Sequence, residues 1–172
     1  MNKKHEKQGI FEKLWAPWRM KYIEEIDTGA DGGCIFCDKP NENNDCENLI
    51  VRRGKKCFVI LNKFPYNNGH LLIVPYAHTS ELSELGGDTM LEMMQTVELV
   101  VAAMKKIMRP DGFNVGMNLG RSSGAGIAEH LHLHVVPRWN GDTNFMPVVS
   151  GTKVISESLE DSYEKIKNAL KD

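Results

Sequence analysis

The pattern of apolar and polar positions predicts an antiparallel β-sheet with buried strands. Apolar runs at 57–61 and 70–75 flank Asn67-Asn68-Gly69, a sequence typical of tight turns, and together they predict a hairpin. Further strands are expected over 113–118 and over 130–135, where leucines alternate with histidines. Runs of this length are usual for the strands of a small sheet.

Two helical patterns accompany these strands. The longer helix is expected from about Thr89 to Met108, with Asp88 as its N-cap, and the shorter one covers 158–170. Apolar residues at three- and four-residue spacing predict the core-facing stripe of the longer helix: Leu91, Met94, Val97, Val101, Met104 and Ile107. The sequence therefore predicts an α+β fold, in which a long helix covers one face of an antiparallel sheet.

Three of the six histidines, His130, His132 and His134, alternate within five residues. On an extended strand they would share one face, with Leu131 and Leu133 on the other. Imidazole titrates near neutral pH and is a common metal ligand, so this row predicts a site for phosphate chemistry, metal chemistry or both. The alternative is a metal-free polar strand with three ordinary histidines.

Composition and charge narrow the class of protein. The 172 residues, 41% hydrophobic and 26% charged, suit one soluble domain with a full core. A net charge of −2 provides no basic surface for nucleic acid or for an acidic membrane, and we expect neither as a partner. No apolar run is long enough to span a bilayer, and four cysteines without a signal peptide favour a reducing compartment. We therefore expect a cytoplasmic protein.

A metal site is predicted around Cys34-Ile35-Phe36-Cys37, which has the spacing of a zinc knuckle and needs two further ligands. Cys46 and Cys57 are one candidate pair, but they form no second knuckle, and Cys57 begins an apolar strand. His78 and His130 are the favoured pair. A redox role for the two cysteines is disfavoured because the βαβ context of thioredoxin-like motifs is missing.

His132, the middle histidine of the row, is the candidate nucleophile. A neutral imidazole can attack an activated phosphorus atom and form a covalent phosphoramidate, which divides one hard displacement into two easier ones. A backbone carbonyl on the same strand is expected to hold the required tautomer. The imidazoles on either side would hold phosphate oxygens or protonate a leaving group.

A glycine-rich loop, 120–126, precedes the histidine strand. Exposed backbone N–H groups in such a loop can form a nest for phosphate oxygens. Asn118, Ser122 and Ser123 are the side-chain donors that we expect to assist. Arg121 either neutralises a distal phosphate or is simply solvated.

Residues 124–139 (GAGIAEHLHLHVVPRW) resemble the signature of the histidine-triad (HIT) superfamily, in which three histidines alternate with apolar residues. The segment 61–78 is similar to the family's first hairpin, Asn118 and its loop to the phosphate loop, and 34–37 to the zinc-binding branch. The resemblance implies a HIT-like fold and a homodimer formed by sheets that pair across subunits. It also implies that His132 is the nucleophile, that His134 contacts phosphate, and that a structural Zn²⁺ has four ligands: Cys34, Cys37, His78 and His130.

The resemblance further implies where a nucleotide binds. Nucleoside contacts are expected at Asn62, Lys63 and Phe64, although Asn62 replaces the acidic residue that contacts the ribose in many members. Ile127 occupies a position where a hydroxyl residue is common, so phosphate is expected to bind other loop groups. The expected phosphate-binding residues are Asn118, Ser122, Ser123, Gly124, Gly126 and His134.

The flanking sequences narrow the family branch. Leu14–Met20, Glu129 and 137–145 resemble the bacterial diadenosine tetraphosphate phosphorylases. This resemblance implies an enzyme that cleaves dinucleoside polyphosphates, with inorganic phosphate as the second nucleophile and ATP and ADP as products. It divides the chain into three parts: an N-terminal extension over 1–33, a HIT-like catalytic domain over 34–145 and a C-terminal extension with a helix over 146–172. At least two of the three tryptophans, Trp15, Trp18 and Trp139, are expected in core or dimer packing.

Three alternatives remain at this point. The same residues could serve a hydrolase that uses water, acting on dinucleoside polyphosphates or nucleoside phosphoramidates. The site could instead belong to a regulatory module that binds a nucleotide without turnover. A zinc-stabilised interaction domain is the third alternative, but it leaves His132, His134 and the glycine-rich loop unexplained.

Overall fold

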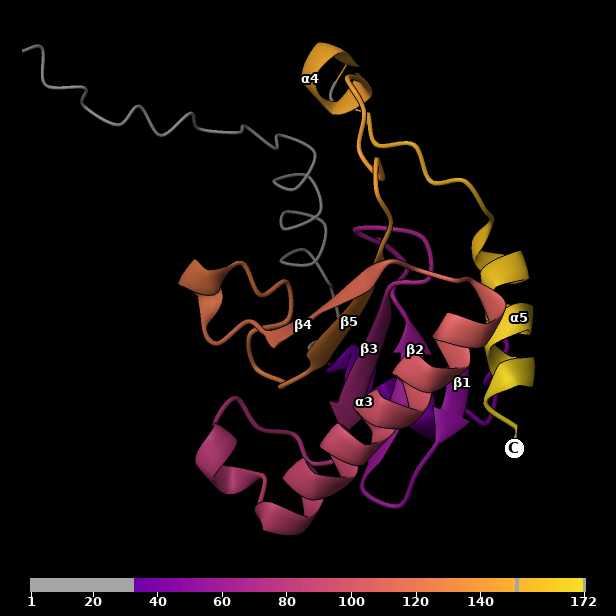
Figure 1. Ribbon diagram of the computed structural model, residues 1–172. Helices are drawn as coiled ribbons and strands as arrows, with labels where there is room; N and C mark the ends of the chain where they lie inside the picture. Colours follow the sequence, from indigo (N-terminus) through magenta and orange to yellow (C-terminus); the bar gives the residue numbers. More distant parts are fainter. Residues whose placement is uncertain (1–32, 151, 172) are drawn as a thin grey trace, which may run out of the picture.

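The computed structural model describes residues 33–150 and 152–171, and its centre is a five-stranded antiparallel sheet (Figure 1). The strand order is β1-β2-β3-β5-β4, so β1 and β4 are the edge strands. The bounds are β1 Ile50–Arg53, β2 Cys57–Leu61, β3 Leu71–Pro75, β4 Gly112–Met117 and β5 Leu133–Arg138. The predicted hairpin is confirmed as β2 and β3. β1 was not predicted, because a four-residue strand that ends in two arginines has little apolar pattern.

The sheet separates two apolar clusters. Alternate residues of β2 and β3 point to opposite faces, and both strands are buried throughout. The larger cluster contains Leu131, Leu133 and Val135, as the alternation in the histidine row predicts. The smaller cluster lies on the other face of the sheet and includes Phe36 and Phe58. This second face is the one that carries the histidines.

Two helices lie side by side over the first face: α3 (Gly87–Ile107) and α5 (Leu159–Ala169) (Figure 1). The shorter predicted helix is confirmed as α5, whose N-cap Ser158 accepts a hydrogen bond from the backbone N–H of Asp161 at 3.0 Å. Its side chains Tyr163 and Ile166 enter the larger core cluster. The C-terminal helix is therefore packed into the same core as the sheet.

Two details predicted for α3 were wrong. Its N-cap is Gly86, at φ +72°, so Asp88 lies inside the first turn, where a carboxylate favours the helix dipole. Of the predicted stripe, Val97 and Met104 are buried and Val101 packs against the core, but Leu91 and Met94 are 59% and 56% exposed, and Ile107 is also exposed. The stripe that faces the core is Met93, Val97, Val100, Ala103 and Met104. Apolar residues occur on more than one face of this helix, so spacing alone could not identify the buried one.

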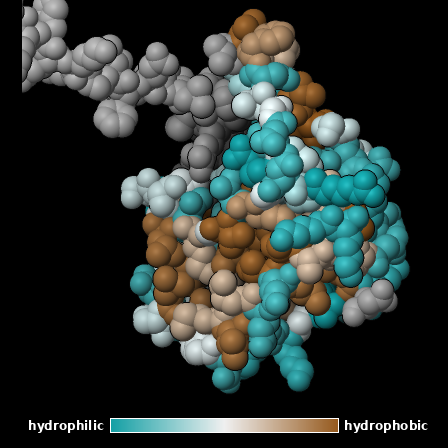
Figure 2. All heavy atoms as spheres, viewed as in Figure 1, coloured by the Kyte–Doolittle hydropathy of each residue, from teal (hydrophilic) through white to brown (hydrophobic). Residues whose placement is uncertain are grey.

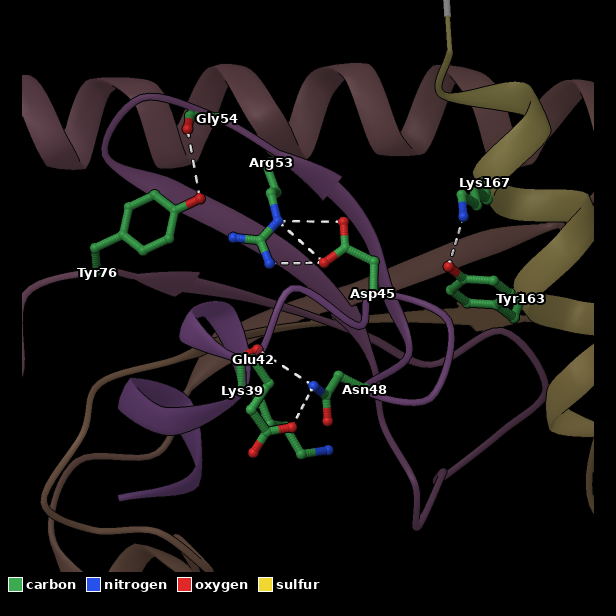
Figure 3. Close-up of polar contacts among 9 residues, drawn as sticks. All are labelled: Lys39, Glu42, Asp45, Asn48, Arg53, Gly54, Tyr76, Tyr163 and Lys167. Atoms are coloured by element: carbon green, nitrogen blue, oxygen red, sulfur yellow. Dashed lines mark hydrogen bonds and ion pairs between the residues drawn. The ribbon is translucent and has the colours of Figure 1, made fainter. Parts of the chain in front are cut away.

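Short elements complete the fold: α2 (Ile35–Asp38), η1 (Lys39–Asn41), η2 (Leu82–Glu84), η3 (Arg121–Ser123) and α4 (Met146–Ser150). The loop that joins η1 to β1 is held to the sheet edge by the Arg53–Asp45 ion pair at 2.6 Å (Figure 3). In the same loop the Asn48 amide donates to the Glu42 carboxylate at 2.7 Å and to the Lys39 carbonyl.

Some expectations lie beyond what the structure describes. Trp15 and Trp18 are outside the described residues, as is the predicted N-terminal extension apart from Gly33. Within 33–150 and 152–171, none of the helices combines the length and the apolarity needed to cross a membrane.

Candidate active site and metal centre

The histidine row leads into β5, an interior strand of the sheet that pairs with β3 on one side and with the edge strand β4 on the other. The register sets Leu72 and Gly116 opposite His134. His130 and His132 immediately precede β5 and are buried, with the ring of Phe36 against both at centroid distances of 5.5 and 5.1 Å. Phe36, from the Cys-x-x-Cys segment, thus connects the predicted metal site to the predicted nucleophile.

The structure brings the four predicted metal ligands together, with one ligand atom of each within 4.8 Å of the others. The Nδ1 atoms of His78 and His130 are 3.3 Å apart, and sulfur–Nδ1 distances are 3.2 Å for Cys34–His130 and 3.4 Å for Cys37–His78. A tetrahedral zinc ion with ordinary bond lengths requires edges of about 3.4 Å between two nitrogens and about 3.6 Å between sulfur and nitrogen. The four side chains therefore fit one tetrahedral metal ion.

The tautomer of His130 also suits a metal. Its Nε2 lies 2.8 Å from the Pro75 carbonyl oxygen, which can only accept, so Nε2 carries the ring proton and Nδ1 keeps its lone pair. Metal-binding histidines commonly donate their second N–H to a carbonyl in this way. His130 is fully buried, whereas His78 is exposed, so the site lies at the border between core and solvent.

The other two cysteines lie elsewhere. Cys46 is exposed in the loop before β1. Cys57 is buried, with its sulfur 3.7 Å from a Glu92 carboxylate oxygen and 3.6 Å from the Thr96 hydroxyl. The four-cysteine alternative is therefore incompatible with this geometry.

His132 has the tautomer that a nucleophile requires. Its Nδ1 is 2.9 Å from the carbonyl oxygen of His130, as expected for a backbone carbonyl on the same strand. Because a carbonyl only accepts, Nδ1 is protonated and the lone pair is on Nε2. Burial lowers the pKa of His132, an effect partly opposed by this hydrogen bond, so the ring is neutral near pH 7.

His70 is a member of the site that the sequence did not reveal. It precedes β3, is fully buried, and its Nε2 lies 2.9 Å from Nδ1 of His134. On the other side of the ring, Nδ1 accepts from the Tyr66 backbone N–H at 3.0 Å and faces the Asn62 amide at 3.2 Å. In the sequence, the one indication was that His70 stands at the start of an apolar run, next to a turn. A histidine in that context is equally well explained as an ordinary core residue.

His70 stays neutral over the physiological range. Burial is the main cause, and positive charge at His134, His132 or Lys153 adds to it, so the pKa of His70 falls to about 3. A neutral ring whose Nδ1 accepts from a backbone N–H must carry its proton on Nε2. It therefore donates to His134, whose own proton is then on Nε2.

The glycine-rich loop connects β4 to the histidine row. Met117, the last residue of β4, pairs with Leu133, the first residue of β5, so Asn118 and His132 are the residues at which the two strands leave the sheet. Ser122 and Ser123 lie on η3 and are exposed, and the Ser123 hydroxyl donates to the Gly120 carbonyl at 2.7 Å. Gly124 has φ +88°, a left-handed conformation that ends η3. Gly126, like Gly124, is half-buried.

The predicted nucleoside contacts lie at the end of β2. Asn62 is half-buried beside His70, whereas Lys63 is exposed and Phe64 is 47% exposed. Ile127, where a hydroxyl was expected from the family pattern, packs against the cluster around Phe36. Hydrophobic packing therefore accounts for that substitution.

Comparison with known proteins gives a consistent result. The family model described as HIT domain matches residues 43–141. An AP-4-A phosphorylase of Mycobacterium tuberculosis (strain ATCC 25618 / H37Rv) is 43% identical over 157 residues, which cover 88% of this chain and 80% of that protein. An adenosine 5'-monophosphoramidase, hnt1, of Schizosaccharomyces pombe is 25% identical over 80% of this chain and 98% of its own length.

Among solved structures, a Zn-bound histidine triad family protein from Mycobacterium smegmatis superposes with a TM-score of 0.65. It is 27% identical, and the match covers 80% of this chain and 93% of that chain. This similarity confirms the predicted α+β fold.

Proposed function

This chain belongs to the HIT domain family, and we propose that it is a diadenosine tetraphosphate phosphorylase that works through a nucleotide covalently bound to His132. The observation that carries the proposal is the His132 tautomer, in which the His130 carbonyl binds Nδ1–H and leaves a lone pair on Nε2. The similarity to the mycobacterial AP-4-A phosphorylase supports the choice of substrate.

In the first step, Nε2 of His132 attacks the α-phosphorus, the phosphorus of the tetraphosphate chain that is attached to one adenosine. A nitrogen–phosphorus bond forms as the bond from phosphorus to the bridging oxygen breaks, leaving adenylate on the histidine and releasing ATP. In the second step, an oxygen of inorganic phosphate attacks the same phosphorus, the nitrogen–phosphorus bond breaks, and ADP leaves. His132 returns to its starting form.

His134 is the proposed proton donor and phosphate ligand. Its ring lies beside that of His132 at a centroid distance of 4.9 Å, and its proton is on Nε2 because Nδ1 accepts from His70. An adjacent N–H can bind a phosphate oxygen or protonate the leaving group. The remaining substrate contacts are proposed at the strand end and the glycine-rich loop: Asn62, Lys63, Phe64, Asn118, Ser122, Ser123, Gly124 and Gly126.

Zinc is the proposed metal for Cys34, Cys37, His78 and His130, because two thiols and two imidazoles form a donor set that zinc commonly takes. When bound, the ion would supply structural stability rather than chemistry, since all four positions are taken by protein ligands. The protein itself fixes His130 by burial and by the hydrogen bond to the Pro75 carbonyl. This also fixes the His130 carbonyl that orients His132.

A homodimer is proposed from the surface next to β4. Half of the residues of this edge strand are exposed, and the free edge of a strand can pair with a second copy. Figure 2 shows hydrophobic surface over α3 and β4 on this side, where Leu91, Met94 and Val115 are exposed.

The proposal also includes a catalytic domain over 34–145 and a cytoplasmic location. The cytoplasm is proposed because thiol ligands for a metal stay reduced in that compartment.

The direct test is to mix the protein with diadenosine tetraphosphate, with and without inorganic phosphate, and to separate the nucleotides by ion exchange. ADP, and ATP beyond one equivalent per protein, are expected only when phosphate is present, and His132→Ala is expected to abolish the formation of both while the protein stays folded. ATP and AMP without phosphate would instead indicate a hydrolase. Undiminished turnover by the His132 variant would refute the covalent mechanism.

A further inference from the structure

The turn between β2 and β3 supplies two hydrogen-bond donors to one ring nitrogen of His70. The Phe64 backbone N–H donates to Oδ1 of Asn62 at 2.9 Å, and this contact sets the orientation of the amide. The Asn62 NH₂ group then faces Nδ1 of His70 at 3.2 Å, and the Tyr66 backbone N–H points to the same nitrogen at 3.0 Å. Nδ1 of His70 is therefore an acceptor.

The ring of Tyr66 covers both imidazoles of this pair. It stacks on His134 with an interplanar angle of 9° and a centroid distance of 5.7 Å, and its centroid is 4.7 Å from that of His70. The tyrosine is 41% exposed, so one side of it faces solvent while the other packs on the histidines. Rotation of either imidazole would break this packing as well as the bond between them.

From this arrangement we propose that Asn62 and Tyr66 are positioning residues that act through His70 to keep the ring proton of His134 on Nε2. The inference rests on the proposed function and deepens it: Asn62 orients the proton donor in addition to any contact with the nucleoside. The order of donors is Asn62 and Tyr66 to His70, then His70 to His134.

The amide at position 62 strengthens this arrangement. An aspartate offers only acceptors, so Asn62→Asp would replace one of the two donors at Nδ1 of His70 by an acceptor, while the Tyr66 backbone N–H remains. In the molecules in which Nδ1 of His70 becomes protonated, Nε2 of that neutral ring loses its proton, and His134 must then donate from its own Nδ1. Both tautomers reverse in these molecules, and their His134 lacks the Nε2 proton that phosphate binding requires.

The test uses the full-length, zinc-loaded protein with ¹⁵N-labelled histidine. Long-range ¹H–¹⁵N correlation spectra at pH 7 distinguish protonated from unprotonated ring nitrogens. In the wild type we expect both His70 and His134 to be protonated on Nε2. In Asn62→Asp we expect a mixture in which part of His70 is protonated on Nδ1, and kcat with diadenosine tetraphosphate to fall by the fraction of His134 that has lost its Nε2 proton. KM should change less than kcat.

Matched variants separate this effect from added charge and from lost packing. Asn168→Asp makes the same amide-to-acid change at an exposed position on α5, where the side chain accepts from Lys171, and should leave both tautomers unaltered. Tyr66→Ala should give a mixture of tautomers at His134, and Tyr66→Phe, which retains the ring, should restore the single form. The tyrosine pair keeps the inference testable if Asn62→Asp does not fold.

Wild-type tautomers in both Asn62→Asp and Tyr66→Ala would overturn the inference, as would a loss of kcat in Asn62→Asp without a change of tautomer. If wild-type protein does not cleave diadenosine tetraphosphate, the proposed function fails. The spectra then decide the positioning role by themselves, because they require no substrate.

Discussion

The buried His70 should make the stability of this protein depend on pH in a way that one substitution can isolate. The pKa of His70 is about 3 in the folded protein and about 6.5 in the unfolded chain. Between these values the unfolded chain binds a proton that the folded protein does not, so stability falls as pH falls below about 6.5. From pH 7 to pH 5 this difference amounts to about 2 kcal/mol of unfolding free energy.

His70→Asn removes the titrating group and retains an oxygen that can accept from the Tyr66 N–H. The assay is urea denaturation of zinc-loaded wild type and variant at pH 7, 6 and 5. The variant is expected to be less stable at pH 7, because a buried ring is lost, but to lose about 2 kcal/mol less than wild type on going to pH 5. Taking this double difference cancels the protonation of metal ligands, which both proteins share.

Equal pH dependence in the two proteins would refute the reasoning, since it would mean that His70 has similar pKa values in the folded and unfolded states. The groups that face His70 are His134, His132 and Lys153. If His70→Asn is less stable than wild type by the same amount at all three pH values, the pH dependence of the unfolding free energy comes entirely from these three groups or from the metal site, and not from His70.

Three further predictions concern the supports of the site. Phe36→Ala should lower the unfolding free energy by about 3–5 kcal/mol in urea titrations, and should also lower kcat, because the ring is 3% exposed and packs on two histidines. Phe145 is 69% exposed, so the control Phe145→Ala should change the unfolding free energy by less than about 0.5 kcal/mol. Gly69→Ala should cost about 1–2 kcal/mol, because Gly69 has φ +69° and an added methyl would lie 2.8 Å from a core methionine. Gly87 has open space where a Cβ would lie, so the control Gly87→Ala should leave stability unchanged. Equal shifts of the melting temperature in Gly69→Ala and Gly87→Ala would contradict the role of the left-handed turn at Gly69. Cys37→Ser should remove zinc measured by atomic emission and, with it, about 4 kcal/mol of stabilisation at a zinc concentration 1,000 times the dissociation constant. Full zinc content in that variant would exclude Cys37 as a ligand.

Much of the fold was predictable because it follows from short-range patterns. The β2–β3 hairpin follows from two apolar runs around an Asn-Asn-Gly turn, and α5 from the shorter helical pattern over 158–170. The position of helix α3 along the chain was predicted, but not which of its faces is buried. Leu91 and Met94 fit the helical period just as well as the residues that are buried do. Choosing between such faces requires knowledge of what packs against the helix.

By itself the sequence determined the candidate chemistry of this protein, since the alternation of His130, His132 and His134 places three imidazoles on one side of any extended strand. Only the tertiary structure decided how that chemistry is oriented. His70 meets His134 across 64 residues of chain because β3 and β5 are neighbours in the sheet, and the carbonyl of Pro75 orients His130 across 55 residues. Tautomers depend on which donor or acceptor faces each nitrogen, and that contact exists only once the strands are paired.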